Sequence, residues 1–369
     1  QLFFNMTRFL EPLGIRTGYL AQNLPPSERR EVLAGAASGS IQVLVGTHAL
    51  IQAEVRFKKL ALAVIDEQHK FGLFQRAGLK EKAAGGTVPH LLLMTATPIP
   101  RTLAMTLYGD LDISTVAELP KGRSPVKTFW VGEEKRDEIY RLLDALLSEG
   151  RQGYVICPLV DDGGKPLAAK SAEAAFRELS SRFPDRKVAL LHGRLKAPEK
   201  KRIMQDFKDG RIELLVSTVV VEVGVDVPNA TMMIVENAER FGLAQLHQLR
   251  GRVGRGTEES MCVLFSKAPG EEASERLAAF SETASGFDIA EKDLSLRGAG
   301  DLVGGRQHGF PALRIGDLSR DLDLLTAARA EAAGVVEKDP SLASPEHRAY
   351  REALRSRFPV PDAKLAVMA

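Results

Sequence analysis

The sequence has few cysteines, almost no net charge and no long apolar run. Two cysteines occur in 369 residues, and Cys157 and Cys262 both lie inside apolar runs. This pattern excludes a disulfide framework or a cysteine-rich zinc site and predicts buried, reduced thiols. The formal net charge is only +2, so any basic surface must be local. No apolar run reaches the ~20 residues that span a bilayer, and no signal peptide is recognisable. We therefore expect a cytoplasmic protein with no membrane partner.

A phosphate-binding loop is also missing. The pattern G-x-x-x-x-G-K-[ST], which cradles nucleotide phosphates, occurs nowhere in the sequence. The nearest candidate, Gly163–Pro166, lacks the second half of the pattern, and the sequence starts at Gln1 rather than at a methionine. We therefore expect the chain to be the later part of a longer protein.

The pattern of apolar residues predicts an α/β protein. Short apolar runs alternate with helical patterns up to residue 268, which is typical of buried parallel strands in βαβ units. The predicted strands are 41–45, 60–66, 91–96, 154–160, 188–191, 214–218, 232–236 and 261–266. The predicted helices are 26–37, 133–147, 271–285, 287–296, 318–336 and 345–358. We therefore predict two parallel-sheet domains in tandem, residues 1–122 and 123–268, followed by a helical region, residues 269–369.

Two carboxylates lie at the carboxyl end of the predicted strand 60–66. Ligands of parallel sheets bind at the carboxyl ends of strands, so Asp66 and Glu67 are candidate catalytic residues. Asp66 suits Mg²⁺, a hard cation that prefers carboxylate oxygen, and Glu67 suits the activation of a water that attacks a γ-phosphate. Thr95 and Thr97 end the next strand, where hydroxyls can link nucleotide state to domain closure. The alternative for the threonines is a capped helix start before Pro98.

An arginine-rich segment, Gln248–Arg255, lies on the second predicted domain. The planar guanidinium of arginine matches phosphate and keeps its charge, so Arg252 and Arg255 are candidates for contact with a γ-phosphate. Gln248, Gly224 and Asp226 are candidates for further contacts with the nucleotide or with these arginines. The alternative is a solvated basic helix end.

Several other strand ends carry side chains that suit nucleic acid. Thr218 ends the strand 214–218, where a hydroxyl can bind a DNA phosphate. Thr47, His48 and His192 also follow strands and lie beside glycines. A structural histidine is an equally good interpretation of His48 and of His192.

Together, these motifs resemble those of superfamily 2 helicases, and more closely those of the RecG family of DNA translocases. The matching segments are Asp66–His69, Thr95–Thr102, Glu222–Ala230, Gln248–Arg255 and a helical segment with its following loop, Phe287–Gly309. The resemblance implies two RecA-like domains, the first incomplete, and a C-terminal helical hairpin. It also implies that ATP and Mg²⁺ drive movement along duplex DNA, with Arg297 and Gln307 coupling the motor to the DNA.

The resemblance further implies double-stranded and branched DNA as partners, such as stalled forks and Holliday junctions. Single-stranded-DNA-binding protein is a candidate partner, and we expect a monomer. The family's phosphate-binding loop and its N-terminal wedge domain are missing from the sequence, so we expect this chain alone not to hydrolyse ATP. Two alternatives stay open: a transcription-repair coupling translocase, against which His69 argues, and a non-catalytic interaction module derived from a helicase.

Overall fold

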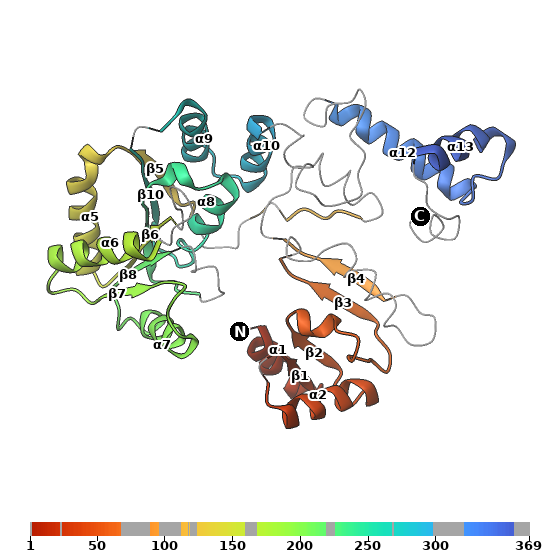
Figure 1. The fold of residues 1–369 in the computed structure, drawn as a ribbon, viewed down its shortest axis with the longest axis horizontal. Coiled ribbons are helices and arrows are strands. Elements are labelled where there is room, and N and C mark those ends of the chain that lie inside the picture. The colour runs from red at the N-terminus through yellow and green to blue at the C-terminus, as the bar shows by residue number, and fades with distance from the viewer. Residues whose placement is uncertain are drawn as a thin grey trace. The chain divides into compact units, whose positions relative to one another are not determined.

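The computed structural model describes most of the chain in two units. The described residues are 2–22, 24–67, 89–95, 112–116, 118, 124–158, 168–218, 226–267, 269–297 and 321–357. One unit comprises residues 1–97 with 223–225, and the other comprises residues 98–222 with 226–369. The ribbon in Figure 1 labels the elements of both units.

The described residues of the first unit form two pairs of parallel strands. The strands are β1 (Thr17–Leu20), β2 (Val43–Gly46), β3 (Leu62–Ile65) and β4 (His90–Leu93), and the helices are α1 (Leu2–Leu10) and α2 (Pro26–Ser38). Strand β1 pairs with β2, and β3 pairs with β4. The prediction of parallel strands and of a helix starting at Pro26 is confirmed, whereas β1 was not predicted.

The prediction that β3 and β4 are buried is wrong for one of their faces. Leu62 and Val64 on β3 are 55% and 51% exposed, and Leu92 on β4 is 49% exposed. Val64 lies opposite Leu92 in the register, and alternate residues of a strand share a face. A run of apolar residues therefore does not show by itself that both faces of its strand are covered.

The second unit is built on a six-stranded parallel sheet with the strand order β5-β10-β9-β6-β8-β7. The strands are β5 (Lys127–Val131), β6 (Gln152–Cys157), β7 (Val188–Leu191), β8 (Leu214–Thr218), β9 (Ala230–Val235) and β10 (Met261–Phe265). Every residue of β6, β8 and β9 is buried. The five predicted strands of this sheet are confirmed, with ends that differ by a few residues, and the edge strand β5 was not predicted.

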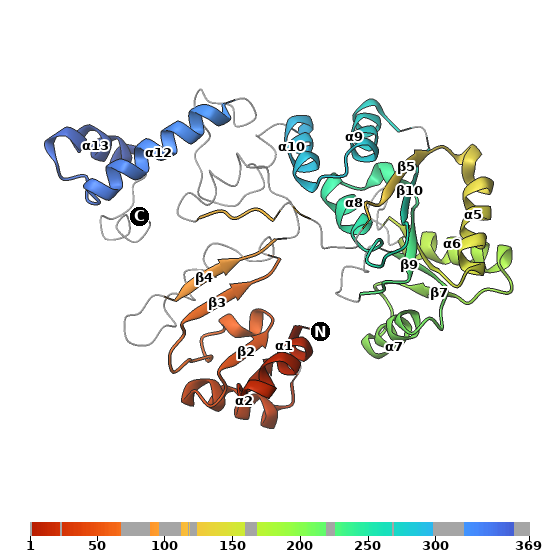
Figure 2. The same cartoon turned by 180° about the vertical axis from the view of Figure 1, so that it is seen from behind.

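Helices cover both faces of this sheet. The helices are α5 (Arg136–Ser148), α6 (Ala168–Arg182), α7 (Ala197–Lys208) and α8 (Leu243–Arg250). Leu143 of α5 and Leu179 of α6 belong to the core that covers one face. On the other face, the ring of Tyr154 packs 4.8 Å from that of Phe207 in α7. Figure 2 shows the same sheet from behind, with α5 and α6 on one side and α8 on the other.

The C-terminal part is helical, as predicted. It contains α9 (Glu271–Glu282), α10 (Gly286–Arg297), α12 (Leu322–Lys338) and α13 (Arg348–Arg357). Helix α9 packs against β5, and α10 packs against α8 and α9. Asp339, after α12, accepts hydrogen bonds from the backbone amides of Ala343 and Ser344, which shapes the loop before α13. No helix among the described residues has the length and apolar character needed to cross a membrane.

Candidate nucleotide and nucleic-acid site

Three candidate residues of the first unit lie at the same edge of the β3–β4 pair. Asp66 and Glu67 directly follow β3, and Thr95 follows β4 by two residues. The amide of Met94 donates a hydrogen bond to the carbonyl of Ile65 at 2.8 Å, which keeps the two strand ends together. The carboxylates and the Thr95 hydroxyl therefore leave neighbouring strands at one edge, whereas Thr97 lies outside the described residues.

The backbone at Glu67 is strained. Its φ is +53°, a left-handed conformation that costs a residue with a side chain about 1–3 kcal/mol and often marks a functional position. Its amide donates a hydrogen bond to Asp66 Oδ1 at 2.9 Å. This turn presents two carboxylates side by side where β3 ends.

The oxygen ligands at this edge fit a magnesium ion that is also bound by the phosphates of a nucleotide. The exposed carboxylate of Asp66 supplies the hard oxygen ligand that Mg²⁺ prefers. Within the described parts of the chain, no cluster of three or more His, Cys, Asp or Glu side chains is arranged to hold a metal. One carboxylate completed by phosphate oxygens and water is the usual coordination of Mg²⁺ at nucleotide sites.

Thr47 and His48 follow β2 in a tightly packed turn. Thr47 is extended, and its carbonyl accepts a hydrogen bond from the amide of Leu50 at 3.0 Å, which closes a short 3-10 helix over His48–Ile51. A Cβ atom on the preceding Gly46 would collide with the carbonyl oxygen of Leu20. Glycine is therefore required there for the close approach of two strands.

The second unit places His192 and Thr218 at the ends of the neighbouring strands β7 and β8. His192 is half-buried, and its Nδ1 accepts a hydrogen bond from the amide of Arg194 at 3.3 Å. Ser217 Oγ donates to the carbonyl of Leu191 at 2.9 Å and so ties the two strand ends together. Thr218 is only 1% exposed, and its buried Oγ1 has no hydrogen-bond partner among the described residues. Its hydroxyl therefore lies inside the domain and not on its surface.

The turn after α8 brings an arginine and an aspartate together. Arg255 Nη1 lies 3.3 Å from Asp226 Oδ1, and the Arg255 side chain is 32% exposed. Arg255 Nε also donates to the carbonyl of Gly251 at 3.0 Å. Burial raises the pKa of Tyr154, and the charges of Arg252, Arg255 and Asp226 also act on that pKa. The contact of Arg255 with Asp226 therefore places these two side chains together, whereas Gly224 lies outside the described residues.

Close packing fixes the backbone of this turn. Gly254 has a φ of +70°, and a Cβ atom there would lie 2.7 Å from Val126 Cγ2. A Cβ atom on Gly256 would lie 2.8 Å from the carbonyl oxygen of Pro228. Both glycines are therefore required where the turn meets neighbouring backbone, and Pro228 is only two residues from Asp226. Gln248 lies in the preceding helix α8.

Arg250, from the same segment, has a different environment. It is 5% exposed, and its guanidinium donates to carbonyl oxygens after and within α9. Burial lowers its pKa. The sequence does not distinguish this arginine from Arg252 and Arg255, because its partners lie about thirty residues further along the chain.

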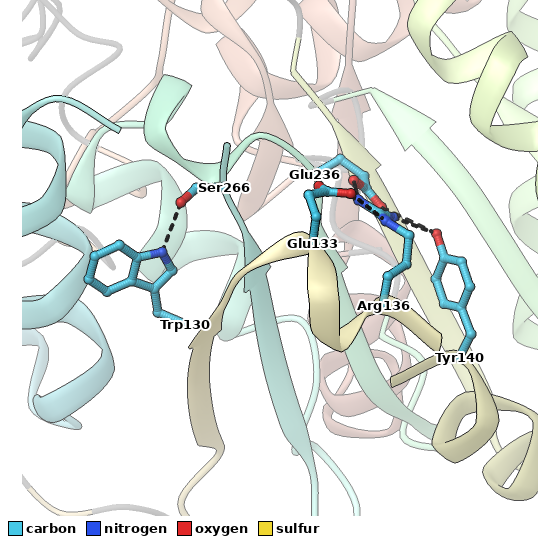
Figure 3. Close-up of polar contacts among 6 residues, drawn as sticks. All are labelled: Trp130, Glu133, Arg136, Tyr140, Glu236 and Ser266. Atoms are coloured by element: carbon cyan, nitrogen blue, oxygen red, sulfur yellow. Dashed lines mark hydrogen bonds and ion pairs between the residues drawn. The ribbon is translucent and has the colours of Figure 1, made fainter. Parts of the chain in front are cut away.

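A second polar cluster, shown in Figure 3, lies where β9 and β5 end and α5 begins. Arg136 donates to both carboxylate oxygens of Glu236, at 2.6 and 2.8 Å, and to both oxygens of Glu133, at 2.8 Å each. It also donates to Tyr140 Oη at 2.7 Å. The hydrogen bond from Arg136 holds the pKa of Glu133 below its usual value. No local sequence pattern indicates this cluster, since Arg136 and Glu236 are 100 residues apart.

Family models match three successive parts of the chain. Residues 1–106 match the DEAD/DEAH box helicase model, and residues 134–257 match the helicase conserved C-terminal domain. Residues 283–357 match the C-terminal part of domain 3 of the ATP-dependent DNA helicase RecG. These matches confirm the predicted fold class with two RecA-like domains.

Curated relatives carry the same name over almost the whole chain. The ATP-dependent DNA helicase RecG of Haemophilus influenzae is 48% identical over 342 residues, which are 92% of this chain and 49% of that protein. The RecG of Bacillus subtilis is 44% identical over 351 residues, 95% of this chain and 51% of that protein. The chain therefore spans about half the length of the curated relatives it matches.

Solved structures agree with these relatives. A RecG bound to a three-way DNA junction is 43% identical, with a TM-score of 0.65, over 87% of this chain and 41% of that one. The DNA-bound DUF1998 helicase MrfA is 16% identical, with a TM-score of 0.57, over 77% of this chain and 43% of that one, and supports the fold alone. From these matches, the chain belongs to the RecG family of helicases.

Proposed function

We propose that the chain is the motor portion of an ATP-dependent DNA helicase that remodels branched DNA, such as stalled replication forks and Holliday junctions. The observation that carries the proposal is the partly exposed Arg255, held against Asp226 beside Arg252 in a domain that matches the helicase C-terminal model. Arginines in such positions stabilise the charge that develops during phosphoryl transfer and can contribute ~10³–10⁵ in rate.

The carboxylates of the first unit complete the proposed chemistry. Asp66 would hold Mg²⁺, and a bound Mg²⁺ neutralises charge on the phosphates of ATP. Glu67 orients the attacking water and accepts its proton, for which the turn after β3 holds it in place. Arg252 and Arg255 stabilise the phosphate oxygens, and Gln248, Gly224 and Asp226 contact the nucleotide or these arginines.

We assign DNA contact to residues at the strand ends and coupling to DNA movement to the C-terminal region. Thr47, His48, Thr95, Thr97 and His192 would face nucleic acid, whereas the buried hydroxyl of Thr218 is left out of this assignment. Arg297 and Gln307 would couple the motor to its movement. The RecG that was solved on a three-way junction supports branched DNA as the substrate. The match of residues 283–357 to RecG favours this function over transcription-repair coupling.

The wider assignments follow from the same proposal. The domains would be residues 1–122, 123–268 and 269–369, the protein a cytoplasmic monomer, and single-stranded-DNA-binding protein a candidate partner. The bacterial relatives, which are named as DNA helicases, are consistent with this setting.

The proposal is tested in a longer form of the chain that includes a phosphate-binding loop. Glu67→Gln should bind ATP but not hydrolyse it, because the amide keeps the size and loses the basicity of the carboxylate. Arg255→Ala should lower turnover by at least about 10²-fold with little loss of nucleotide affinity. Lys135→Ala, which removes an exposed ion pair with Glu138, is the control. Wild-type DNA-stimulated hydrolysis in either test variant would refute the role given to that residue.

A further inference from the structure

Arg250 is a buried cation whose donors are occupied by the end of another helix. Its Nη1 donates to the carbonyl oxygens of Phe280, at 3.4 Å, and of Thr283, at 2.7 Å. Its Nη2 donates to the carbonyl of Ala284 at 3.0 Å. The guanidinium also lies 4.4 Å from the ring centroid of Phe280. These contacts leave it buried and directed away from solvent, so it is unsuited to bind a phosphate.

The acceptors explain why an arginine fits this position. Helix α9 ends at Glu282, and the last carbonyls of a helix have no partners within the helix. These carbonyls form the negative end of the helix dipole, which a cation stabilises. The planar fork of a guanidinium reaches acceptors from two nitrogens at once, whereas an ammonium offers all of its donors from a single atom. Arg250 Nη1 also lies 3.4 Å from Thr128 Oγ1 on β5 and so links the helix end to the sheet.

Backbone hydrogen bonds connect Arg250 directly to the turn that contains Arg252 and Arg255. The carbonyl of Arg250 accepts a hydrogen bond from the amide of Val253 at 3.3 Å, and the Arg252 amide donates to the carbonyl of Leu249 at 2.9 Å. Arg255 Nε returns to the carbonyl of Gly251, the residue after the anchor, and its Nη1 reaches Asp226. A shift of Arg250 would therefore move the backbone from which Arg252 and Arg255 extend.

We propose that Arg250 is a positioning residue: by fixing the end of α8 on the carbonyls that end α9, it sets the place of Arg252 and Arg255. This inference rests on the proposed function of those two arginines at the nucleotide. Their effect on a transition state depends on placement, and a misplacement of about 1 Å can cost 10²-fold in rate. The buried Arg250 thereby sets the geometry of two arginines that are less buried than itself.

The first test is hydrogen–deuterium exchange on the whole chain. Arg250→Met keeps most of the side-chain volume and removes every donor. We expect exchange at the amides of residues 251–255 to become at least about tenfold faster, because the turn loses its anchor. The matched control is Arg186→Met, which removes a partly buried arginine that contacts Asp144 and lies at the opposite edge of the sheet, before β7. The control should destabilise the domain and leave exchange of the turn unchanged.

The second test is hydrolysis in the longer form that includes a phosphate-binding loop. Arg250→Met should lower kcat for DNA-stimulated ATP hydrolysis by roughly 10–100-fold and change KM for ATP less than about threefold. Arg250→Lys should recover only part of the loss. N-methylguanidinium, added to Arg250→Ala below denaturing concentrations, should restore both hydrolysis and slow exchange of the turn. Arg250→Lys, which keeps a cation, and the rescue of Arg250→Ala also serve if Arg250→Met does not fold.

The outcomes separate the two proposals. If the longer wild-type form hydrolyses no ATP, the proposed function fails, and the exchange experiment still decides whether Arg250 fixes the turn. If exchange of residues 251–255 rises no more than in Arg186→Met, the positioning role is overturned. It is also overturned if kcat falls only in proportion to the loss of folded protein.

Discussion

Replacing Arg136 by alanine should destabilise the second unit strongly. This side chain lies between two carboxylates and donates to both oxygens of each, as well as to Tyr140. Its guanidinium also lies 4.2 Å from the ring centroid of Phe265 at the end of β10. Arg136→Ala would remove the cation and leave Glu133 and Glu236 facing each other without it.

The burial of the three side chains sets the size of the effect. Arg136 is 20% exposed, Glu236 is 14% exposed and Glu133 is 37% exposed. Breaking a buried ion pair by removing one partner costs about 3–5 kcal/mol. Solvent screens part of this interaction, and the carboxylate of Glu133 can rehydrate, so we expect a loss of about 2–3 kcal/mol in the free energy of unfolding. For a unit of this size the loss corresponds to a fall in Tm of roughly 4–12 °C.

Trp130 provides the measurement. It is the only tryptophan of the chain, it lies on β5 of the same sheet, and its Nε1 donates to Ser266 Oγ at 2.8 Å. Its fluorescence during thermal and urea unfolding therefore reports on this sheet. Lys135→Ala is the matched control, because its ion pair with Glu138 is 54% and 63% exposed and should contribute less than about 0.5 kcal/mol. If Arg136→Ala costs no more than this control, the cluster in Figure 3 does not stabilise the domain.

Two further predictions concern pH and catalysis. Burial, followed by the charge of Arg250, lowers the pKa of His247 from 6.5 to about 4, so the unfolded chain takes up a proton at a higher pH than the folded chain. The free energy of unfolding should then be highest above pH 6.5 and fall by up to about 3 kcal/mol as the pH drops toward 4. His247→Gln should flatten this part of the pH profile measured by urea unfolding, and an unchanged profile would refute the assignment. The chain alone should release no phosphate from ATP even with DNA, because its sequence holds no phosphate-binding loop; turnover comparable to that of an intact helicase would contradict this.

The strands that the sequence predicted are short runs of mostly apolar residues. Strands β6, β8 and β9 are buried throughout, as central parallel strands are, and the partly buried edge strand β7 was predicted with the same bounds, Val188–Leu191. Strand β5 escaped prediction because it begins with the polar residues Lys127 and Thr128, and Phe129 is 45% exposed. The exposed face of β3 and β4 was missed for the opposite reason, since its residues are as apolar as those of a central strand.

The candidate site divides in the same way. The strand-end position of Asp66 could be predicted because it follows from local sequence and from the geometry of parallel sheets. The burial of Thr218 and the pairing of Arg136 with Glu236 could not be found, because they depend on contacts between distant segments. The strained φ of Glu67 has no signal in its residue type.

The three arginines of one short segment show why residue type alone does not assign a role. Burying a charge costs desolvation free energy, so a buried charge by itself does not show that a protein is stabilised. The burial of Arg250 therefore needs an explanation in its contacts. Its acceptors supply one: several carbonyls at one helix end need donors, and a guanidinium provides them in a single rigid plane. Arg255, five residues later, keeps a third of its side chain exposed and pairs with one carboxylate. Arginines of one segment therefore have different roles: Arg250 holds the backbone in place, and this keeps Arg252 and Arg255 in position.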